Sequence, residues 1–166
     1  FFIALRKDLA EPFMEQKDMF TVLPKLKLDF NEKEIPFKYI FTEKKGYKAP
    51  PSVVKYLEKC KEGDCCNLYH PNKSFSNYFR TNFDRAMGTL TASLKRSSCG
   101  YFSKFEDNNW YGITVKEALL CQSYPLDYNF LNNTDHYYLI GMSVPPVMMA
   151  QIASQIYEQW LFKINN

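Results

Sequence analysis

The chain has 166 residues, of which 46% are hydrophobic and 17% aromatic. This composition excludes an intrinsically disordered protein, and the length suits one domain, or one lobe with a small accessory domain. The net charge of +3 permits a nucleic-acid partner without requiring one. No apolar run approaches membrane-spanning length, so we expect no membrane partner. Five unevenly spaced cysteines do not suggest a disulfide framework, so we expect reduced thiols and a cytoplasmic location.

The first third of the chain predicts three short elements. Phe1 to Leu5 is an apolar run typical of a buried strand, and a natural protein seldom starts in mid-strand, so we expect further sequence upstream. A second short strand is predicted at residues 37–42. Two prolines then introduce a helix from Val53 to Cys60, for which Ser52 is the expected N-cap.

A cysteine-rich segment follows that helix. Cys60, Cys65, Cys66 and His70 are residue types that bind zinc. Their spacing differs from that of paired zinc knuckles, and adjacent cysteines do not easily point the same way. We therefore favour a thiol-bearing loop over a metal site and predict no metal.

From His70 to Lys104, aromatic and basic residues alternate. Cations neutralise phosphates, and aromatic faces can stack on exposed bases, which favours a nucleic-acid surface. On the residues alone, we favour a solvated basic surface over a small aromatic core. The residues concerned are Phe75, Tyr78, Phe79, Phe83, Lys73, Arg80, Arg85, Lys95, Arg96 and Lys104.

The stretch from Ile113 to Pro146 has the clearest local signals. Thr114 and Glu117 form a capping box, in which each side chain satisfies a backbone donor at the start of a helix. That helix must stop before Pro125. After a polar turn, Tyr137–Pro146 ends in a serine and two prolines, which predict the first turn of a last helix.

The closing segment, Val147 to Lys163, is predicted to be that helix. Apolar residues recur at four-residue steps, as on the core-packing face of a helix. They are Met148, Ile152, Ile156 and Trp160. On the residues alone this is a core-packing helix; if its apolar face were exposed, it would be an association surface or an aggregation liability.

Several of these segments resemble motifs of the DNA (cytosine-5) methyltransferases. The sequences TVKEALLCQSYP and YYLIGMSVPP resemble the family's last two motifs, "T-x-x-E…Q-x-F-P" and "G-N-S-V-P-P". FFIALRKDL resembles the second half of a core strand of the type "R-x-F-F-I-A-x-R-x-D". Residues 80–92 are similar to the "R…D…P-x-x-T-L-T" entry to the target recognition domain. The resemblance covers nearly the whole chain, but only the C-terminal half of the family.

This resemblance implies an α/β fold. The chain would be the C-terminal part of a doubly wound methyltransferase core that uses S-adenosylmethionine, with a small, irregular, mixed target recognition domain. Residues 1–40 would be the end of the catalytic core and a connection. Residues 41–110 would be the recognition domain, and residues 111–166 the return to the core.

The resemblance also implies a reaction and shows which parts of it are missing. Family members flip a cytosine out of the duplex and methylate its carbon five. Their nucleophile lies in a Pro-Cys motif, an assisting glutamate in Glu-Asn-Val, and the cofactor on a Phe-x-Gly-x-Gly loop. None of these motifs occurs here. We expect Cys121 to be a core or surface residue, and no catalytic residue in this chain.

The implied role is therefore that of part of a DNA (cytosine-5) methyltransferase, inactive alone. Its partners would be double-stranded DNA and the N-terminal catalytic half, either a separate subunit or a missing part of the same chain. The cofactor pocket would be shared with that half. The implied cofactor-binding residues are Met142, Ser143 and Val144, the implied DNA-binding residues are Arg80, Thr89 and Thr91, and the implied structural residue is Glu117. Lys95 and Arg96 are added as DNA-binding residues on their charge alone.

Two positions depart from the family pattern. The asparagine before the serine of the last motif is Met142, which removes a hydrogen-bonding amide. The arginine expected six residues before Glu117 is Tyr111, which leaves an ion-pair role vacant. These changes support an alternative, a non-catalytic DNA-binding or regulatory relic of a methyltransferase. A structural domain with a coincidental match is the third possibility.

Overall fold

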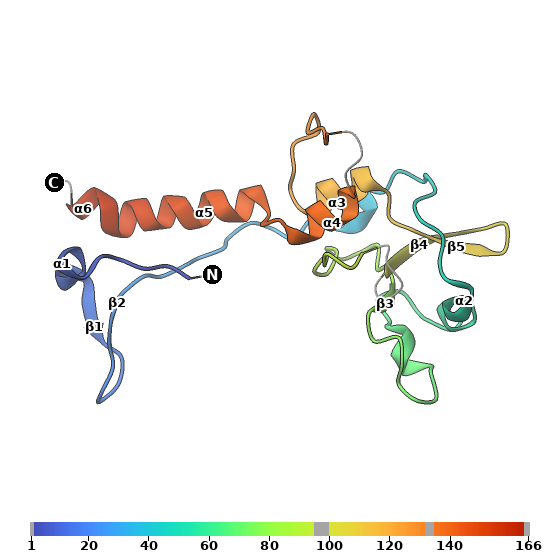
Figure 1. Cartoon of the computed structure of the whole chain (residues 1–166), viewed down its shortest axis with the longest axis horizontal. Coiled ribbons are helices and arrows are strands. Elements are labelled where there is room, and N and C mark those ends of the chain that lie inside the picture. The colour runs from blue at the N-terminus through green and yellow to red at the C-terminus, as the bar shows by residue number, and fades with distance from the viewer. Residues whose placement is uncertain (1, 95–99, 132–134, 165–166) are drawn as a thin grey trace. The chain divides into compact units, whose positions relative to one another are not determined.

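The computed structural model describes residues 2–94, 100–131 and 135–164. The chain divides into two compact units (Figure 1). The terminal unit joins residues 1–32 to residues 147–166, and the central unit comprises residues 33–146. Small sheets and short helices occur together, so the predicted mixed α/β class is confirmed.

In the described part of the central unit, the sheet has three strands. They are β3 (Tyr78–Arg80), β4 (Gly100–Glu106) and β5 (Asn109–Gly112). β3 runs parallel to β4, and β4 and β5 form an antiparallel hairpin. The two residues of its turn, Asp107 and Asn108, both have positive φ, which the tightest hairpin turns require and which Asp and Asn tolerate.

One core of the central unit lies beside this sheet. Helix α2 (Pro51–Leu57) contributes Val53 and Leu57, which are fully buried with Phe102 of β4. The predicted helix is thus confirmed, but its predicted cap at Ser52 is wrong. Pro51 already occupies the first turn, Pro50 is the N-cap residue, and no side chain of the described residues caps the helix. The other core residues are Ala49, Tyr56, Cys60, Cys66, Tyr78 and Trp110.

The second core of the central unit gathers around two helices, α3 (Val115–Cys121) and α4 (His136–Met142). The capping box at the start of α3 is present as predicted. Helix α4 was not predicted; Asp135 caps it by accepting a hydrogen bond from the Tyr138 N–H. The buried residues of this core are Phe37, Leu90, Leu94, Ile113, Ala118, Tyr137 and Ile140.

The strand predicted at residues 37–42 is wrong. Phe37–Tyr39 forms a short 3₁₀ helix, η2. The backbone N–H groups of Ile40 and Phe41 both donate to the Phe37 carbonyl, which closes the turn. This turn places the ring centres of Phe37 and Phe41 5.8 Å apart, and both rings pack against the ring of Phe83. Tertiary packing of three aromatic rings therefore overrides the local strand preference.

The terminal unit combines N-terminal elements with the closing helix. Its elements are α1 (Lys7–Ala10), η1 (Glu11–Phe13), the paired strands β1 (Met14–Gln16) and β2 (Val22–Pro24), and α5 (Pro146–Ile156), which continues through a π-helical turn (Tyr157–Leu161) into α6 (Phe162–Ile164). The predicted closing helix is confirmed, and both Ile152 and Trp160 are buried. The predicted strand at the N-terminus is wrong, because residues 2–6 have no regular structure. A strand needs a hydrogen-bonding neighbour, and β1 and β2 pair with each other.

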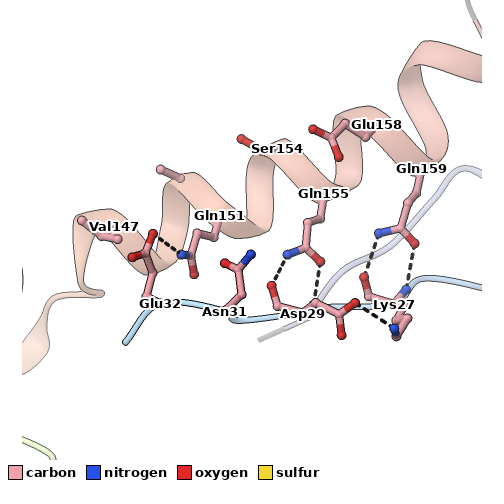
Figure 2. A pocket seen from close by; sticks show the side chains of 11 residues that line it. Lys27, Asp29, Asn31, Glu32, Val147, Gln151, Ser154, Gln155, Glu158 and Gln159 are labelled. Atoms are coloured by element: carbon pink, nitrogen blue, oxygen red, sulfur yellow. Dashed lines mark hydrogen bonds and ion pairs between the residues drawn. The ribbon is translucent and has the colours of Figure 1, made fainter. Parts of the chain in front are cut away.

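A row of glutamines ties an extended segment to the closing helix (Figure 2). Gln159 accepts a hydrogen bond from the Lys27 N–H at 2.9 Å and donates one to the Lys27 carbonyl at 2.7 Å. Gln155 pairs with the backbone of Asp29 in the same way. The helix thus presents side-chain amides to alternate residues, as a neighbouring strand would present its backbone. A groove of about 650 Å³ lies between the segment and the helix.

By length and composition, the segment His136–Ile164 is apolar enough to cross a membrane, with a mean hydropathy of 1.3. The expectation that no stretch reaches that length is therefore too strict. The segment is not one uninterrupted helix, however. α4 ends at Met142, Ser143 is extended, and α5 begins at Pro146. Its second part also carries the polar glutamines just described, so it does not support a membrane span.

Candidate nucleic-acid interface

The threonine-rich segment of the predicted DNA interface lies against helix α4. Gly141, near the end of α4, approaches the backbone of Thr91 and Ala92 so closely that an added Cβ would lie 2.2 Å from the Thr91 carbonyl. Leu90 is buried in the same core, whereas Thr89 and Thr91 on either side of it are exposed. The segment is therefore anchored by its leucine and presents both threonines to solvent.

The predicted cofactor-binding residues lie at the end of α4 and in the turn that follows it: Met142 is the last residue of the helix. Ser143 follows, and both its N–H and its hydroxyl donate to the Ile140 carbonyl. Met142 is 63% exposed and Val144 42% exposed. Because Gly141 contacts Thr91, the fold brings two motifs together that lie about fifty residues apart in sequence.

Glu117 is fully buried and holds three hydrogen bonds. Its Oε1 accepts from the backbone N–H of Thr42 at 2.7 Å and from the Thr42 hydroxyl at 2.8 Å. Its Oε2 accepts from the Thr114 N–H at 2.7 Å. The carboxylate thus joins helix α3 to the chain segment around residue 42. Thr42 and Thr114 thus satisfy the carboxylate with tyrosine at position 111, and sequence reasoning missed Thr42.

The basic residues of the predicted interface differ in their contacts within the protein. Arg80 donates to the Cys60 carbonyl at 2.7 Å, and its guanidinium lies 5.2 Å from the centre of the Trp110 ring. Lys104 forms an ion pair with Glu106 at 2.8 Å. Lys95 and Arg96 lie outside the described residues. Arg85, which sequence analysis counted only as part of a basic pattern, is exposed and lines a cavity beside Thr81.

Tyr111 lies in β5, and its ring contacts the side chain of Lys45. The ammonium group of Lys45 lies 5.2 Å from the centre of the Tyr111 ring, and Lys45 also pairs with Glu106 and Asp107 at 2.8 Å. These two carboxylates raise the pKa of Lys45. Tyr111 is thus part of a charged surface cluster at the hairpin and does not contact Glu117 in any hydrogen bond or ion pair of the described structure.

Three described cysteines of the central unit, Cys60, Cys66 and Cys121, have the properties of structural thiols. Cys60 and Cys66 are buried with their sulfur atoms 3.8 Å apart, and burial raises the pKa of both. Burial, reinforced by Glu117, raises the pKa of Cys121 to about 12, so this thiol stays protonated and is a poor nucleophile. Within the described ranges, no three His, Cys, Asp or Glu side chains come together to hold a metal ion.

Comparisons with known proteins agree with the motifs. The family described as "C-5 cytosine-specific DNA methylase" matches residues 2–158. The chain belongs to this family. It is also 28% identical over 124 residues to a protein named "Type II methyltransferase M.AquIB" from Picosynechococcus sp., an alignment that covers 67% of this chain and 84% of that relative. No solved structure matches the chain. The predicted family is thereby confirmed.

C-5 cytosine-specific DNA methylases take their methyl group from S-adenosylmethionine. The turn from Met142 to Val144 offers apolar side chains to such a cofactor, but the Ser143 hydroxyl is already bonded to the Ile140 carbonyl. None of the cavities described for this chain is lined by the turn. By themselves, these residues therefore do not define a cofactor pocket among the described residues.

Proposed function

We propose that this chain is the target-recognition half of a DNA cytosine-5 methyltransferase and is inactive alone. One observation carries the proposal. The central unit has two well-packed cores and places Thr89 and Thr91 on its surface beside Gly141. The terminal unit, by contrast, has few buried apolar residues. In its described part these are Ala10, Ile152 and Trp160.

The poorly covered terminal unit supports a partner that completes it. Many of its large apolar side chains are exposed, and such surfaces in soluble proteins usually mark association sites. We propose the catalytic half of the enzyme as this partner, because the family's nucleophile, assisting glutamate and cofactor loop are absent from this sequence. The exposed side chains are Phe2, Met14, Met19, Phe20, Val22, Leu23, Phe30, Val147, Met149, Tyr157, Leu161 and Phe162.

The length of the relative supports an enzyme whose recognition half and catalytic half are separate chains. The alignment of 124 positions covers 84% of that methyltransferase chain, which is therefore no longer than about 150 residues. A chain of that size holds one domain of ordinary dimensions. A protein named as a methyltransferase therefore exists at about the length of one domain.

Within the proposed enzyme, residues 41–110 read the DNA, and residues 1–40 and 111–166 rejoin the catalytic core. Thr89 and Thr91 contact the DNA backbone, and the basic residues Arg80, Lys95 and Arg96 neutralise phosphates. Met142, Ser143 and Val144 form one wall of the S-adenosylmethionine site, whose remainder belongs to the catalytic half. We place the assembled enzyme in the cytoplasm.

DNA binding by the chain alone tests the recognition role. We expect affinity for a mixed-sequence duplex to fall by orders of magnitude between about 50 and 200 mM salt, because several phosphate contacts release counterions. Replacing Thr89 and Thr91 together by alanine should weaken binding at every salt concentration. Replacing Thr21 of the terminal unit by alanine serves as the matched control. Binding that is absent at low salt would refute the recognition role.

A second candidate function is a regulatory relic that binds DNA without taking part in methylation. Met142 favours it, because the family's asparagine at that position would offer an amide where this chain offers an exposed thioether. Cofactor binding in the presence of the catalytic half separates the two candidates. A relic binds DNA but leaves cofactor affinity of the catalytic half unchanged.

A further inference from the structure

The extended segment of residues 25–31 is hydrogen-bonded to the closing helix along one side (Figure 2). The backbone N–H and carbonyl groups of Lys27 pair with Gln159, and those of Asp29 pair with Gln155. Side chains four residues apart on a helix are spaced by about 6 Å, and alternate residues of a strand are spaced by about 6.6 Å. The two spacings agree, so the glutamines hold these residues in the extended conformation of a strand.

The other side of this segment is a free strand edge. In an extended chain, the backbone polar groups of successive residues point to opposite sides. Those of Leu26, Leu28 and Phe30 therefore point away from the helix. In the described part of the chain, none of these N–H or carbonyl groups makes a hydrogen bond. Such an edge is a template for pairing with another strand.

The side chains of the segment are divided between two faces. Leu26, Leu28 and Phe30 share one face, because alternate side chains of a strand point the same way. The two leucines are half-buried and Phe30 is 48% exposed. Lys27 and Asp29 lie on the opposite face, where they form an exposed ion pair at 2.8 Å. A strand added at the free edge would extend both the apolar and the charged face.

The segment is complementary to itself in the antiparallel direction. In a pairing centred on Leu28, Leu26 lies opposite Phe30 of a second copy, so the apolar face continues across the pair. Lys27 then lies opposite Asp29, in a non-hydrogen-bonded position where cross-strand side chains come closest. Registers displaced by two residues place Lys27 opposite Lys27, or Asp29 opposite Asp29, and like charges in direct opposition are destabilising. The charge pattern therefore selects one register.

We propose that residues 26–30 pair with the same residues of a second copy of this chain and so form a symmetric dimer. Both copies use the same surface, as in other two-fold interfaces. The free backbone groups of Leu26, Leu28 and Phe30 bond to those of the second copy, and Lys27 of each copy pairs with Asp29 of the other. The dimer gives the assembled protein two recognition units in one particle.

Sedimentation velocity of the full chain at about 1 to 100 μM tests the dimer. We expect a monomer that becomes a dimer as the concentration rises. In the dimer, hydrogen exchange of the Leu28 amide should slow about tenfold or more, whereas the amides of Lys27 and Asp29, already bonded to glutamines, should be unchanged. A chain that stays monomeric would overturn the proposal. A dimer in which the Leu28 amide exchanges no more slowly would also overturn it.

Charge reversal tests the register. Lys27→Asp and Asp29→Lys should each weaken self-association about tenfold or more, because like charges then face each other across the pair. The two variants mixed in equal amounts should associate again, since the acidic pair of one faces the basic pair of the other. Lys17→Asp, at an exposed cation in the turn between β1 and β2, is the matched control and should change the affinity less than about twofold. A mixture that stays monomeric would refute the register.

The catalytic half is the alternative occupant of this edge. Added to the dimer, it should give an assembly that contains two copies of this chain. A complex with one copy of each chain in which the Leu28 amide is still protected would assign the edge to the catalytic half and overturn the proposed dimer. All these measurements are made without DNA. A chain that dimerises but does not bind DNA would therefore refute the recognition role and leave the dimer intact.

Discussion

Glu117 provides the most direct test of how the central unit is held together. Its buried carboxylate accepts three hydrogen bonds, two from Thr42 and one from the Thr114 N–H. In Glu117→Gln, the amide oxygen can keep the Thr42 bonds, but the NH₂ group then faces the Thr114 N–H, donor against donor. One charge-assisted bond is lost, the other two become neutral, and a backbone donor is left without a partner.

The expected cost is large for a change of one atom. A hydrogen bond to a charged group contributes about 1.5–3 kcal/mol, and a buried unsatisfied donor costs about 1–3 kcal/mol. Relief from burying a charge offsets part of this sum, so we expect Glu117→Gln to destabilise the fold by about 2–4 kcal/mol. For a chain of this size that lowers the melting temperature by about 6–12 °C.

Thermal and urea denaturation followed by circular dichroism measures this loss. Glu58→Gln, an exposed carboxylate just after α2, is the matched control and should change stability by less than about 0.5 kcal/mol. Thr42→Val should cost about 1–2 kcal/mol in the wild type and less in the Glu117→Gln background, since both changes break the same contact. A Glu117→Gln protein as stable as the control would refute the three-bond arrangement.

Three further predictions concern other parts of the chain. The free energy of unfolding should fall as the pH rises from about 9 towards 12. The reason is that the pKa of Cys121 is raised to about 12 in the folded protein, whereas the thiol of the unfolded chain ionises near pH 9. Urea denaturation at several pH values should therefore show a shallower decline for Cys121→Ala than for the wild type. Gln155→Ala should speed hydrogen exchange of the Asp29 amide about five- to tenfold and leave the Lys27 amide unchanged, and equal effects on both would contradict the glutamine pairing. Met142→Asn, which restores the family's asparagine, should raise the rate of methyl transfer in the complex with the catalytic half. A lower rate would mean that the cofactor site is built around the methionine.

The sequence predicted the elements that are stabilised by contacts between residues close together in the chain. The capping box at Thr114 is a contact between residues three apart, and the closing helix follows from apolar residues at four-residue steps. The helix after Pro50 was likewise expected from a local signal, the two prolines that introduce it. Glutamines at the same four-residue spacing, Gln151, Gln155 and Gln159, could have predicted a second, polar face on the closing helix, but not what it would bind.

Features that depend on distant residues were not predictable in this way. Phe37–Tyr39 forms a turn because Phe83 packs against it, and Glu117 is satisfied by Thr42, 75 residues away in the sequence. The N-terminal apolar run has the composition of a strand, yet a strand also needs a neighbour to pair with. The cavity beside Thr81 likewise arises from β3, β4 and a loop, none of which carries a sequence pattern of its own.

The predicted role of the segment around Thr89 came from the resemblance to the family and not from its local sequence pattern. Residues around Thr89 have no distinctive periodicity, and only the resemblance singled them out. The structure then gives this segment a physical setting, because Gly141 leaves room for the backbone of Thr91. We expect Gly141→Ala to displace the segment, since the added Cβ would overlap that backbone.

Transfer of labelled methyl from S-adenosylmethionine to unmethylated DNA tests the central claim most directly. It should be measured for this chain alone, for the product of the adjoining upstream coding sequence alone, and for the two mixed. We predict label in the DNA with the mixture and none with either chain alone. Label incorporated by this chain alone would contradict the account, as would a stable complex of the two chains that transfers none.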